Sequence, residues 1–323
     1  MTPAKIRNPA DIESALKAVK AEVGKSVIGY EEQVDDFLIC LLTQGHLLIE
    51  GVPGVAKTTL AKTFSSVCGL SHRRIQFTQD LLPADITGHY FFNQRTTEFE
   101  VRKGALFADL ILADEINRAP PKTQSALLEA MQERQVTIEG NSFDLPDLFT
   151  VIATLNPIET EGVYPLPEAQ IDRFMVKSVM NYLDKANEIE ILKLKNAPEQ
   201  QPTMVLARDA ITGMREEVMT VHAHSSILEY IEEITSASRA LDDLDLGMSP
   251  RAGIHLLQTA KARAYLKGRA YVIPDDVKAM AHKVIDHRLI LSPEAELSGM
   301  TRGGLTDSIL TSVPVPKGEF RSG

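Results

Sequence analysis

Two short segments of the sequence carry residues whose types and spacing suit phosphate chemistry. The first, GVPGVAKT over residues 51–58, connects a short apolar run to a helix-like stretch. A short loop before a helix can direct successive backbone N–H groups at a phosphate, and the helix dipole adds a positive end. Lys57 can reach the β- and γ-phosphates of a nucleotide, and the Thr58 hydroxyl suits Mg²⁺. The residues expected to bind nucleotide here are Gly51, Val52, Pro53, Gly54, Val55, Ala56, Lys57, Thr58 and Thr59.

Ala56 departs from the usual phosphate-loop pattern, which has glycine immediately before the lysine. Because alanine tolerates a positive φ poorly, we expect a negative φ at Ala56 if the loop is functional. The alternative interpretation is a glycine-containing turn between a strand and a helix.

The second segment, LILADE over residues 110–115, places two carboxylates at the end of an apolar run. If this run is a parallel strand near the first one, both ends lie at the same rim of the sheet. Asp114 can then hold Mg²⁺, and Glu115 can orient or deprotonate an attacking water. An acidic helix cap is the simpler alternative for the pair alone. A kinase remains possible at this point, although a carboxylate beside the metal ligand favours hydrolysis.

The first half of the chain alternates segments with helical and strand periodicity, which predicts a parallel sheet covered by helices. Helices are expected at 10–23, 31–44, 57 onward and 120–134, strands at 46–50, 74–77, 106–114 and 148–155, and a hairpin at 135–145 that turns at Gly140-Asn141.

The pattern becomes helical after about residue 181, where we place a domain boundary. Helices are expected at 184–195, 208–219, 226–241, 250–267 and 274–287, with no clear strand among them. The stretch 297–323 is rich in Gly, Ser, Thr and Pro and is expected to be a loosely held tail.

Composition excludes several classes of protein. The 323 residues are 44% hydrophobic with a formal net charge of −10, which argues for folded domains and against a nucleic-acid-coating surface. There is no apolar run long enough to span a membrane and no secretory signal. The two cysteines are too few for a disulfide framework, so a reducing, cytoplasmic compartment is expected.

The sequence resembles the MoxR family of AAA+ ATPases from about Val27 to Asp276. The stretches that carry the resemblance are GVPGVAKT, LADEINRAPPKTQSALLEAMQERQVTIEG, ATLNPIETEGVYPLPEAQIDRF and SPRAGIHLLQTAKARA. It implies an α/β fold: an αβα nucleotide-binding core over 1–181, a helical lid over 182–296, and nucleotide between the two. The implied activity is Mg²⁺-dependent hydrolysis of ATP to ADP and phosphate, in a homo-oligomeric ring that is hexameric.

The resemblance also implies a purpose for the hydrolysis, which is chaperone-like remodelling or activation of a partner protein. Partners in this family often carry a von Willebrand factor A domain. Alternatives are a nucleotide-gated scaffold without significant turnover, a DNA-associated motor, which the net charge disfavours, and a small-molecule kinase.

Further site residues follow from the resemblance. Ile28 and Gly29 match the segment whose backbone meets adenine, and Asn156 resembles the sensor-1 residue that holds the γ-phosphate or the water. Arg173 resembles the arginine finger that reaches a neighbouring subunit's nucleotide. Arg251 resembles sensor 2, which would contact phosphates in its own subunit. The simpler alternatives are a turn former at Asn156 and salt bridges to Asp172 or Glu168 for Arg173 and to Asp245 for Arg251.

Residues 86–103 and the hairpin at 135–145 resemble insertions that face a channel or substrate in related rings. We expect the aromatics Tyr90, Phe91, Phe92 and Phe99 to pack onto their own domain; a solvent-facing Phe92 or Phe99 would favour contact with a partner. The pair His222 and His224 has no nearby cysteine to complete a metal site, and residues 72–74 (HRR) are interpreted as a solvated turn.

Overall fold

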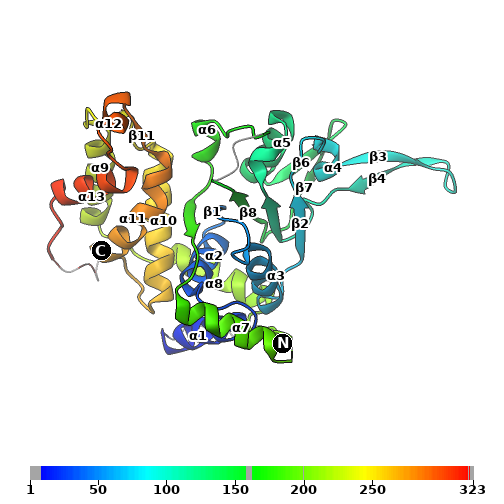
Figure 1. Ribbon diagram of the computed structural model, residues 1–323, viewed down its shortest axis with the longest axis horizontal. Helices are drawn as coiled ribbons and strands as arrows, with labels where there is room; N and C mark the ends of the chain where they lie inside the picture. The colour runs from blue at the N-terminus through cyan, green and yellow to red at the C-terminus, as the bar shows by residue number, and fades with distance from the viewer. Residues whose placement is uncertain (1–8, 158–161, 199, 319, 321–323) are drawn as a thin grey trace.

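The computed structural model describes residues 9–157, 162–198, 200–318 and 320. Residues 1–8 of the predicted core and residues 319 and 321–323 of the predicted tail lie outside this part of the chain. An α/β part carries the phosphate loop, a helical part lies beside it, and a thin hairpin projects from the side away from the helical part (Figure 1).

The central sheet has five parallel strands in the order β2-β5-β8-β1-β9. They are β1 (Leu47–Gly51), β2 (His72–Gln76), β5 (Leu110–Asp114), β8 (Thr150–Leu155) and β9 (Val176–Met180). Four of the five strands match predicted ones. The fifth, β9, was not predicted, and it pairs with β1 along its whole length.

The sheet is covered on both faces, because residues that alternate along each strand point to opposite sides. Leu47 and Ile49 of β1 belong to a core built with helices of the first face, whereas Leu48 belongs to a separate core on the other face. The first face carries α1 (Pro9–Gly24), α2 (Glu31–Leu42) and α3 (Lys57–Val67); the second carries α4 (Pro83–Thr87), α5 (Pro121–Glu133) and the one-turn 3₁₀ helix η1 (Ile116–Arg118). The predicted three-layer αβα core is therefore confirmed.

The helical part begins close to the boundary predicted near residue 181. Its helices are α7 (Lys185–Asn196), α8 (Arg208–Thr220), α9 (Ser225–Arg239), α10 (Pro250–Leu266), α11 (Pro274–Ile285), η2 (Asp286–Arg288), α12 (Pro293–Leu297) and α13 (Arg302–Ser312). A short β-ribbon of β10 (Leu244–Leu246) and β11 (Ile290–Leu291) was not expected. One continuous apolar core runs from α2 and α3 into α8, α10 and α11, so the helical part is joined to the sheet by buried side chains.

The expectation of a loose tail from residue 297 is wrong for α13. This helix buries Leu305, Thr306 and Ile309, and it packs on α9 and α11. Its apolar residues are few, which is why composition alone suggested a tail.

Two hairpins extend from the core. The hairpin of β6 (Gln135–Ile138) and β7 (Asn141–Asp144) confirms the prediction, but its turn is Glu139-Gly140, both with positive φ, one residue earlier than expected. The hairpin of β3 (Gly88–Asn93) and β4 (Glu98–Lys103) is the one that projects from the body (Figure 1).

Candidate functional site

The loop over residues 51–58 connects the end of β1 to the first turn of α3, as the phosphate-loop interpretation requires. A side chain at Gly51 would meet the carbonyl oxygen of Met180 at 2.7 Å, so glycine lets β1 run close to β9. Gly54 has a φ of +86°. The Lys57 ammonium donates to the Gly51 carbonyl oxygen at 2.7 Å, which keeps the lysine over the loop.

Ala56 has φ +59° and ψ 23°, the left-handed conformation, so the prediction of a negative φ was wrong. The chain must reverse direction in one residue before α3 begins at Lys57, and a left-handed residue makes that turn. For a residue other than glycine this conformation costs about 1–2 kcal/mol, which the folded loop stores.

Asp114 ends β5 and is nearly buried, with 8% of its surface exposed. Its Oδ1 accepts a hydrogen bond from the Thr154 hydroxyl at 2.7 Å. Its Oδ2 accepts two from the Arg74 guanidinium of β2, at 2.6 and 3.1 Å. Residues 72–74 are therefore not a solvated turn: Arg74 is the counter-ion of the carboxylate predicted to hold the metal.

Glu115 follows Asp114 in a left-handed conformation, with a φ of +57°. Its backbone N–H donates to the Thr154 hydroxyl oxygen at 2.8 Å, so one threonine contacts both acidic residues. The Glu115 carboxylate accepts from the Gln76 amide at 2.8 Å and from Arg118 at 3.1 Å. Sequence reasoning missed these partners, because they become neighbours only through the strand order.

The two predicted segments meet at one rim of the sheet. β8 lies between β1 and β5, with Glu50 opposite Leu155 and Ala113 opposite Ala153. Strands lie about 4.8 Å apart, so the ends of β1 and β5 are about 10 Å from each other. Asn156, directly after β8, is 5% exposed at the same rim. This spacing leaves room for a triphosphate between the loop and Asp114, the carboxylate predicted to hold the metal together with Thr58.

Ile28 and Gly29 lie at this rim as well, between α1 and α2. Gly29 has a φ of +80°, and a side chain there would meet Leu183 at 2.8 Å. The Tyr30 hydroxyl donates to the Asn181 carbonyl oxygen at 3.0 Å, just beyond β9. The predicted adenine segment is thus next to the end of β9, which pairs with the strand that precedes the loop.

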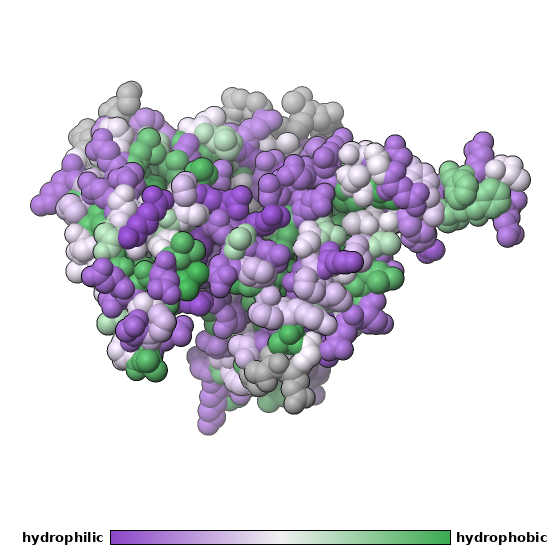
Figure 2. Space-filling view, turned by 90° about the horizontal axis from the view of Figure 1, so that it is seen from above, coloured by the Kyte–Doolittle hydropathy of each residue, from purple (hydrophilic) through white to green (hydrophobic). Residues whose placement is uncertain are grey.

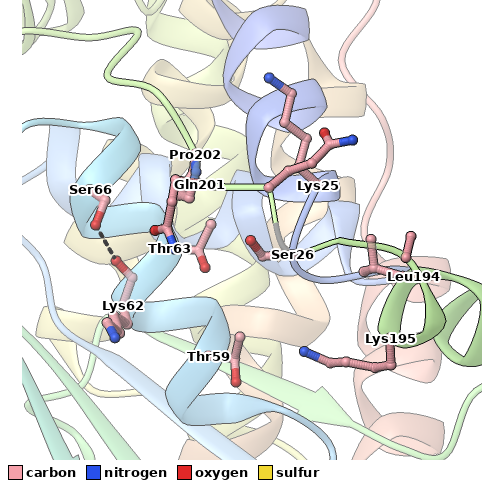
Figure 3. A pocket seen from close by; sticks show the side chains of 12 residues that line it. Lys25, Ser26, Thr59, Lys62, Thr63, Ser66, Leu194, Lys195, Gln201 and Pro202 are labelled. Carbon is pink, nitrogen blue, oxygen red and sulfur yellow. Dashed lines mark hydrogen bonds between the residues drawn. The ribbon is translucent and has the colours of Figure 1, made fainter.

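A pocket of about 350 Å³ opens along α3, starting at Thr59 directly after the loop (Figure 3). Figure 3 shows hydroxyl groups of α3 facing the side chains of the segment after α1 and of α7. Among the described residues that line it, Lys25, Lys62 and Lys195 are charged and none is acidic. Such a wall suits an anionic or polar ligand. The side of this pocket that faces α3 is formed by the segment after α1, by α7 and by the residues after α7, and no described residue of α9–α13 lines the pocket.

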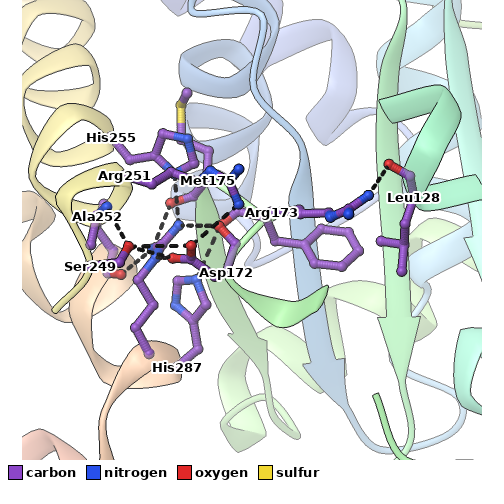
Figure 4. A network of polar contacts seen from close by, with 12 residues as sticks. Leu128, Asp172, Arg173, Met175, Ser249, Arg251, Ala252, His255 and His287 are labelled. Carbon is purple, nitrogen blue, oxygen red and sulfur yellow. Dashed lines mark hydrogen bonds and ion pairs between the residues drawn. The ribbon is translucent and has the colours of Figure 1, made fainter. Parts of the chain in front are cut away.

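Arg173 and Arg251 lie at the opposite rim. Val176 at the start of β9 pairs with Leu47, whereas Met180 at its end pairs with Gly51, where the phosphate loop begins. Arg173 precedes β9, and Arg251 at the start of α10 contacts Asp172 at 3.3 Å (Figure 4). At about 3.3 Å per residue, the strand separates the two rims by about 13 Å. The structure therefore contradicts the expected contact of Arg251 with phosphates in its own subunit.

The two arginines share a cavity of about 190 Å³ with Arg134, a residue that sequence reasoning missed. Arg173 donates to the Leu128 carbonyl oxygen of α5 at 2.8 Å and not to Asp172 or Glu168, and Arg251 pairs with Asp172 instead of Asp245. No carboxylate occurs among the described residues that line the cavity. This arginine face (Arg134, Arg173 and Arg251) therefore suits an anion that arrives from outside the subunit.

Two histidines beside the arginine face are held neutral. Burial, and then the nearby Arg134, lowers the pKa of His46 to about 3; its Nδ1 accepts from the Val151 N–H at 3.0 Å. Burial, and then Arg288, lowers the pKa of His255 to about 3.

The aromatic side chains of the β3–β4 hairpin are more exposed than expected. Phe92 and Phe99 are 51% and 71% exposed and stack edge to face with ring centroids 5.4 Å apart, whereas Tyr90 packs against the core. Figure 2 shows the hydrophobic patch on the projecting hairpin. The prediction that all four aromatics pack onto their own domain was wrong for Phe92 and Phe99, and also for Phe91, which is 39% exposed.

The part of the chain that the structure describes holds no group of three or more His, Cys, Asp or Glu side chains that could bind a metal by themselves. None of its helices is long and apolar enough to cross a bilayer.

Comparisons with known proteins agree with this geometry. The family described as "ATPase family associated with various cellular activities (AAA)" matches residues 46–176, and the "AAA lid domain" matches residues 236–309. The chain is similar to the uncharacterized protein YeaC of Bacillus subtilis, 42% identical over 95% of this chain and 96% of that protein. It is similar to Chaperone MoxR1 of Mycobacterium tuberculosis, 39% identical over 95% and 84% of the two chains. The crystal structure of a putative ATPase from Cytophaga hutchinsonii matches with a TM-score of 0.89 and 42% identity, over 96% and 97% of the two chains.

Proposed function

The chain belongs to the MoxR family of AAA+ ATPases, and from that membership we propose that it hydrolyses Mg²⁺-bound ATP at sites shared between neighbouring subunits of a ring. The observation that carries the proposal is the meeting of the phosphate loop with Asp114, Glu115 and Asn156 at one rim. Membership of the family supports nucleotide hydrolysis in general. The dependence on Mg²⁺, the site shared between subunits and the ring are proposed here.

In this proposal each residue has one task. The loop N–H groups and Lys57 bind the phosphates, and Thr58 and Asp114 hold the Mg²⁺. When bound, the metal neutralises charge on the phosphates. Glu115 orients a water and accepts its proton, and Asn156 donates to the γ-phosphate or to that water. The adenine lies against Ile28 and Gly29.

The position of Arg173 and Arg251 supports a shared site. Both lie at the rim away from their own loop, so any nucleotide that they contact would belong to another subunit. Guanidinium groups that neutralise the transferring phosphoryl are worth roughly 10³–10⁵ in rate, so an isolated subunit should hydrolyse slowly. A closed ring gives every loop such a neighbour, and we propose six subunits.

Steady-state phosphate release tests the proposed activity. We expect turnover by the native chain with Mg²⁺ and none after chelation of the metal. Lys57→Ala should lose nucleotide binding, and Glu115→Gln should bind ATP without releasing phosphate. Normal turnover by Glu115→Gln would remove it from the proton-accepting role. Binding without turnover by the native chain, at concentrations where it forms rings, would favour a nucleotide-gated scaffold instead.

We further propose that hydrolysis takes place in the cytoplasm and remodels or activates a partner protein, for which a protein with a von Willebrand factor A domain is a candidate. A relative named as a chaperone and the solvent-facing Phe92 and Phe99 support this part.

The test uses Glu115→Gln rings as a trap in ATP. A partner recovered with them should be lost when Phe92→Ser and Phe99→Ser are added, while ring formation stays intact. Leu297→Ser, which removes a 90% exposed side chain elsewhere, is the matched control and should retain the partner. Equal recovery with both variants would contradict a role for the hairpin.

A further inference from the structure

Asp172 directly precedes Arg173 in the sequence and joins it to the helical part of the molecule (Figure 4). Its Oδ1 accepts from the Arg288 Nε at 2.8 Å, and its Oδ2 accepts from Arg251 at 3.3 Å. The Ser249 hydroxyl lies 3.1 and 3.2 Å from the two carboxylate oxygens. One carboxylate of the core therefore receives three side chains of the helical part.

The Ser249 contact fixes the start of α10. The Ser249 Oγ also accepts from the backbone N–H of Ala252 at 3.1 Å, so it caps the helix while its hydroxyl is directed at Asp172. Arg251 lies in the first turn, where a cation is unfavourable for the helix dipole. Asp172 offsets that repulsion and sets the direction in which Arg251 leaves the helix.

The Arg288 contact fixes the backbone around Arg173. Arg288 is 6% exposed and donates to the carbonyl oxygens of Asp172 at 3.1 Å and Phe174 at 2.6 Å, one on each side of Arg173. Burial lowers the pKa of Arg288 to about 10, with Asp172 opposing the shift, so this guanidinium stays charged at neutral pH. Arg173 itself is directed by its bond to the Leu128 carbonyl oxygen.

We propose that Asp172 is a positioning residue that holds Arg173 and Arg251 together as one unit for a neighbouring subunit's nucleotide. The proposal rests on the proposed shared site. Asp172 touches no phosphate in this role. It acts on Arg251 directly, through the ion pair, and on Arg173 through the backbone, because Arg288, which pairs with Asp172, also donates to the carbonyl oxygens on either side of Arg173.

Asp172→Asn tests the proposal, because the amide keeps the shape but loses the charge. Misplacing a catalytic group by about 1 Å costs about 100-fold in rate, so we expect kcat to fall about 10- to 100-fold. KM and the affinity for a fluorescent ATP analogue should change less than about threefold, because the variant's own phosphate loop is intact. Asp172→Glu keeps the charge and therefore folds with Arg288 paired; it should show a smaller loss of kcat.

Mixing of subunits separates positioning from a general loss of structure. Lys57→Ala subunits cannot bind nucleotide but carry an intact arginine face, so they should restore turnover at the loops of Asp172→Asn subunits. Asp276→Asn is the matched control: it breaks a buried ion pair with Arg269, 2.6 Å long, within the helical part. It should lower the melting temperature, keep kcat and gain nothing from mixing.

Mixing Arg173→Ala subunits with Lys57→Ala subunits distinguishes a failure of the proposed shared site from a failure of the positioning role of Asp172. If Arg173→Ala is not restored, the shared site itself is refuted. If Arg173→Ala is restored and neither Asp172→Asn nor Asp172→Glu is, the shared site stands and the positioning role is overturned. Native kcat in Asp172→Asn would also overturn it.

Discussion

The amide of Gln76 donates a hydrogen bond of 2.8 Å to the carboxylate of Glu115. Gln76 ends β2 and lies opposite Asp114 in the register of β2 and β5, so this contact joins an edge strand to the predicted water-orienting residue. After β2 the chain continues through α4 into the β3–β4 hairpin.

We expect Gln76→Ala to raise the basal rate of phosphate release, because Glu115 loses a partner that competes with water. A hydrogen bond with a net worth of about 1 kcal/mol shifts the ratio of bonded to unbonded Glu115 by roughly fivefold, so we expect the rate of phosphate release to rise by about that factor. Gln79→Ala, which removes a bond to the Gly162 carbonyl oxygen and none to Glu115, should leave the rate unchanged. A lower rate in Gln76→Ala would mean that Gln76 holds Glu115 in its working position.

Arg251→Ala should impair hydrolysis at the nucleotide site of the neighbouring subunit. The phosphate loop of the variant is itself complete, so adding Lys57→Ala subunits should restore part of the turnover, measured as phosphate release at increasing mixing ratios. Subunits that carry both Lys57→Ala and Arg251→Ala supply no arginine and should restore none. Recovery with these double variants would exclude the trans role.

Ala56→Gly should stabilise the folded chain. The left-handed conformation costs alanine about 1–2 kcal/mol, whereas glycine loses about 0.5–1 kcal/mol more backbone entropy on folding. A net gain of a few tenths to about 1 kcal/mol should appear as a higher melting temperature with nucleotide binding retained. Ala61→Gly, inside α3, should destabilise by about 1 kcal/mol. Equal destabilisation by both would show that Ala56 is not strained.

Stability should fall as the pH is lowered from about 6.5 toward 3. His46 and His255 have a folded-state pKa of about 3, against an ordinary value of 6.5, so the unfolded chain binds protons in this window and the folded chain does not. Each unit of difference is worth about 1.4 kcal/mol per histidine before other groups are counted. Chemical denaturation between pH 7.5 and 4.5 measures the slope. His46→Gln should make it shallower, and an unchanged slope would contradict the assignment.

Much of the fold could be predicted because the pattern of apolar residues, prolines and glycines is regular in this chain. Helix α5 was expected at 120–134 and occupies 121–133, since Pro121 fits its first turn and its apolar residues recur at helical spacing. Strand β9 was missed because VKSVM is short and carries Lys177 and Ser178. Helix α13 was missed because its buried face includes Thr306.

The candidate site was predictable in its residues but not in its partners. A phosphate loop and an acidic strand end have local signatures, which identify Lys57 and Asp114. Arg74, Gln76 and Thr154 come to these residues through strand order, which has no local signature. The family resemblance also points to Arg251, but it assigned this residue to the phosphates of its own subunit; which phosphates Arg251 can reach depends on the rim at which α10 begins.

The opposite placement of the phosphate loop and the arginine face has a consequence for how such a protein would be switched on. A lone copy carries both halves of the proposed machine but cannot bring them together, since a packed sheet stands between them. Under this arrangement, dilution would lower the rate of hydrolysis without any inhibitor, and a high local concentration of subunits would raise it.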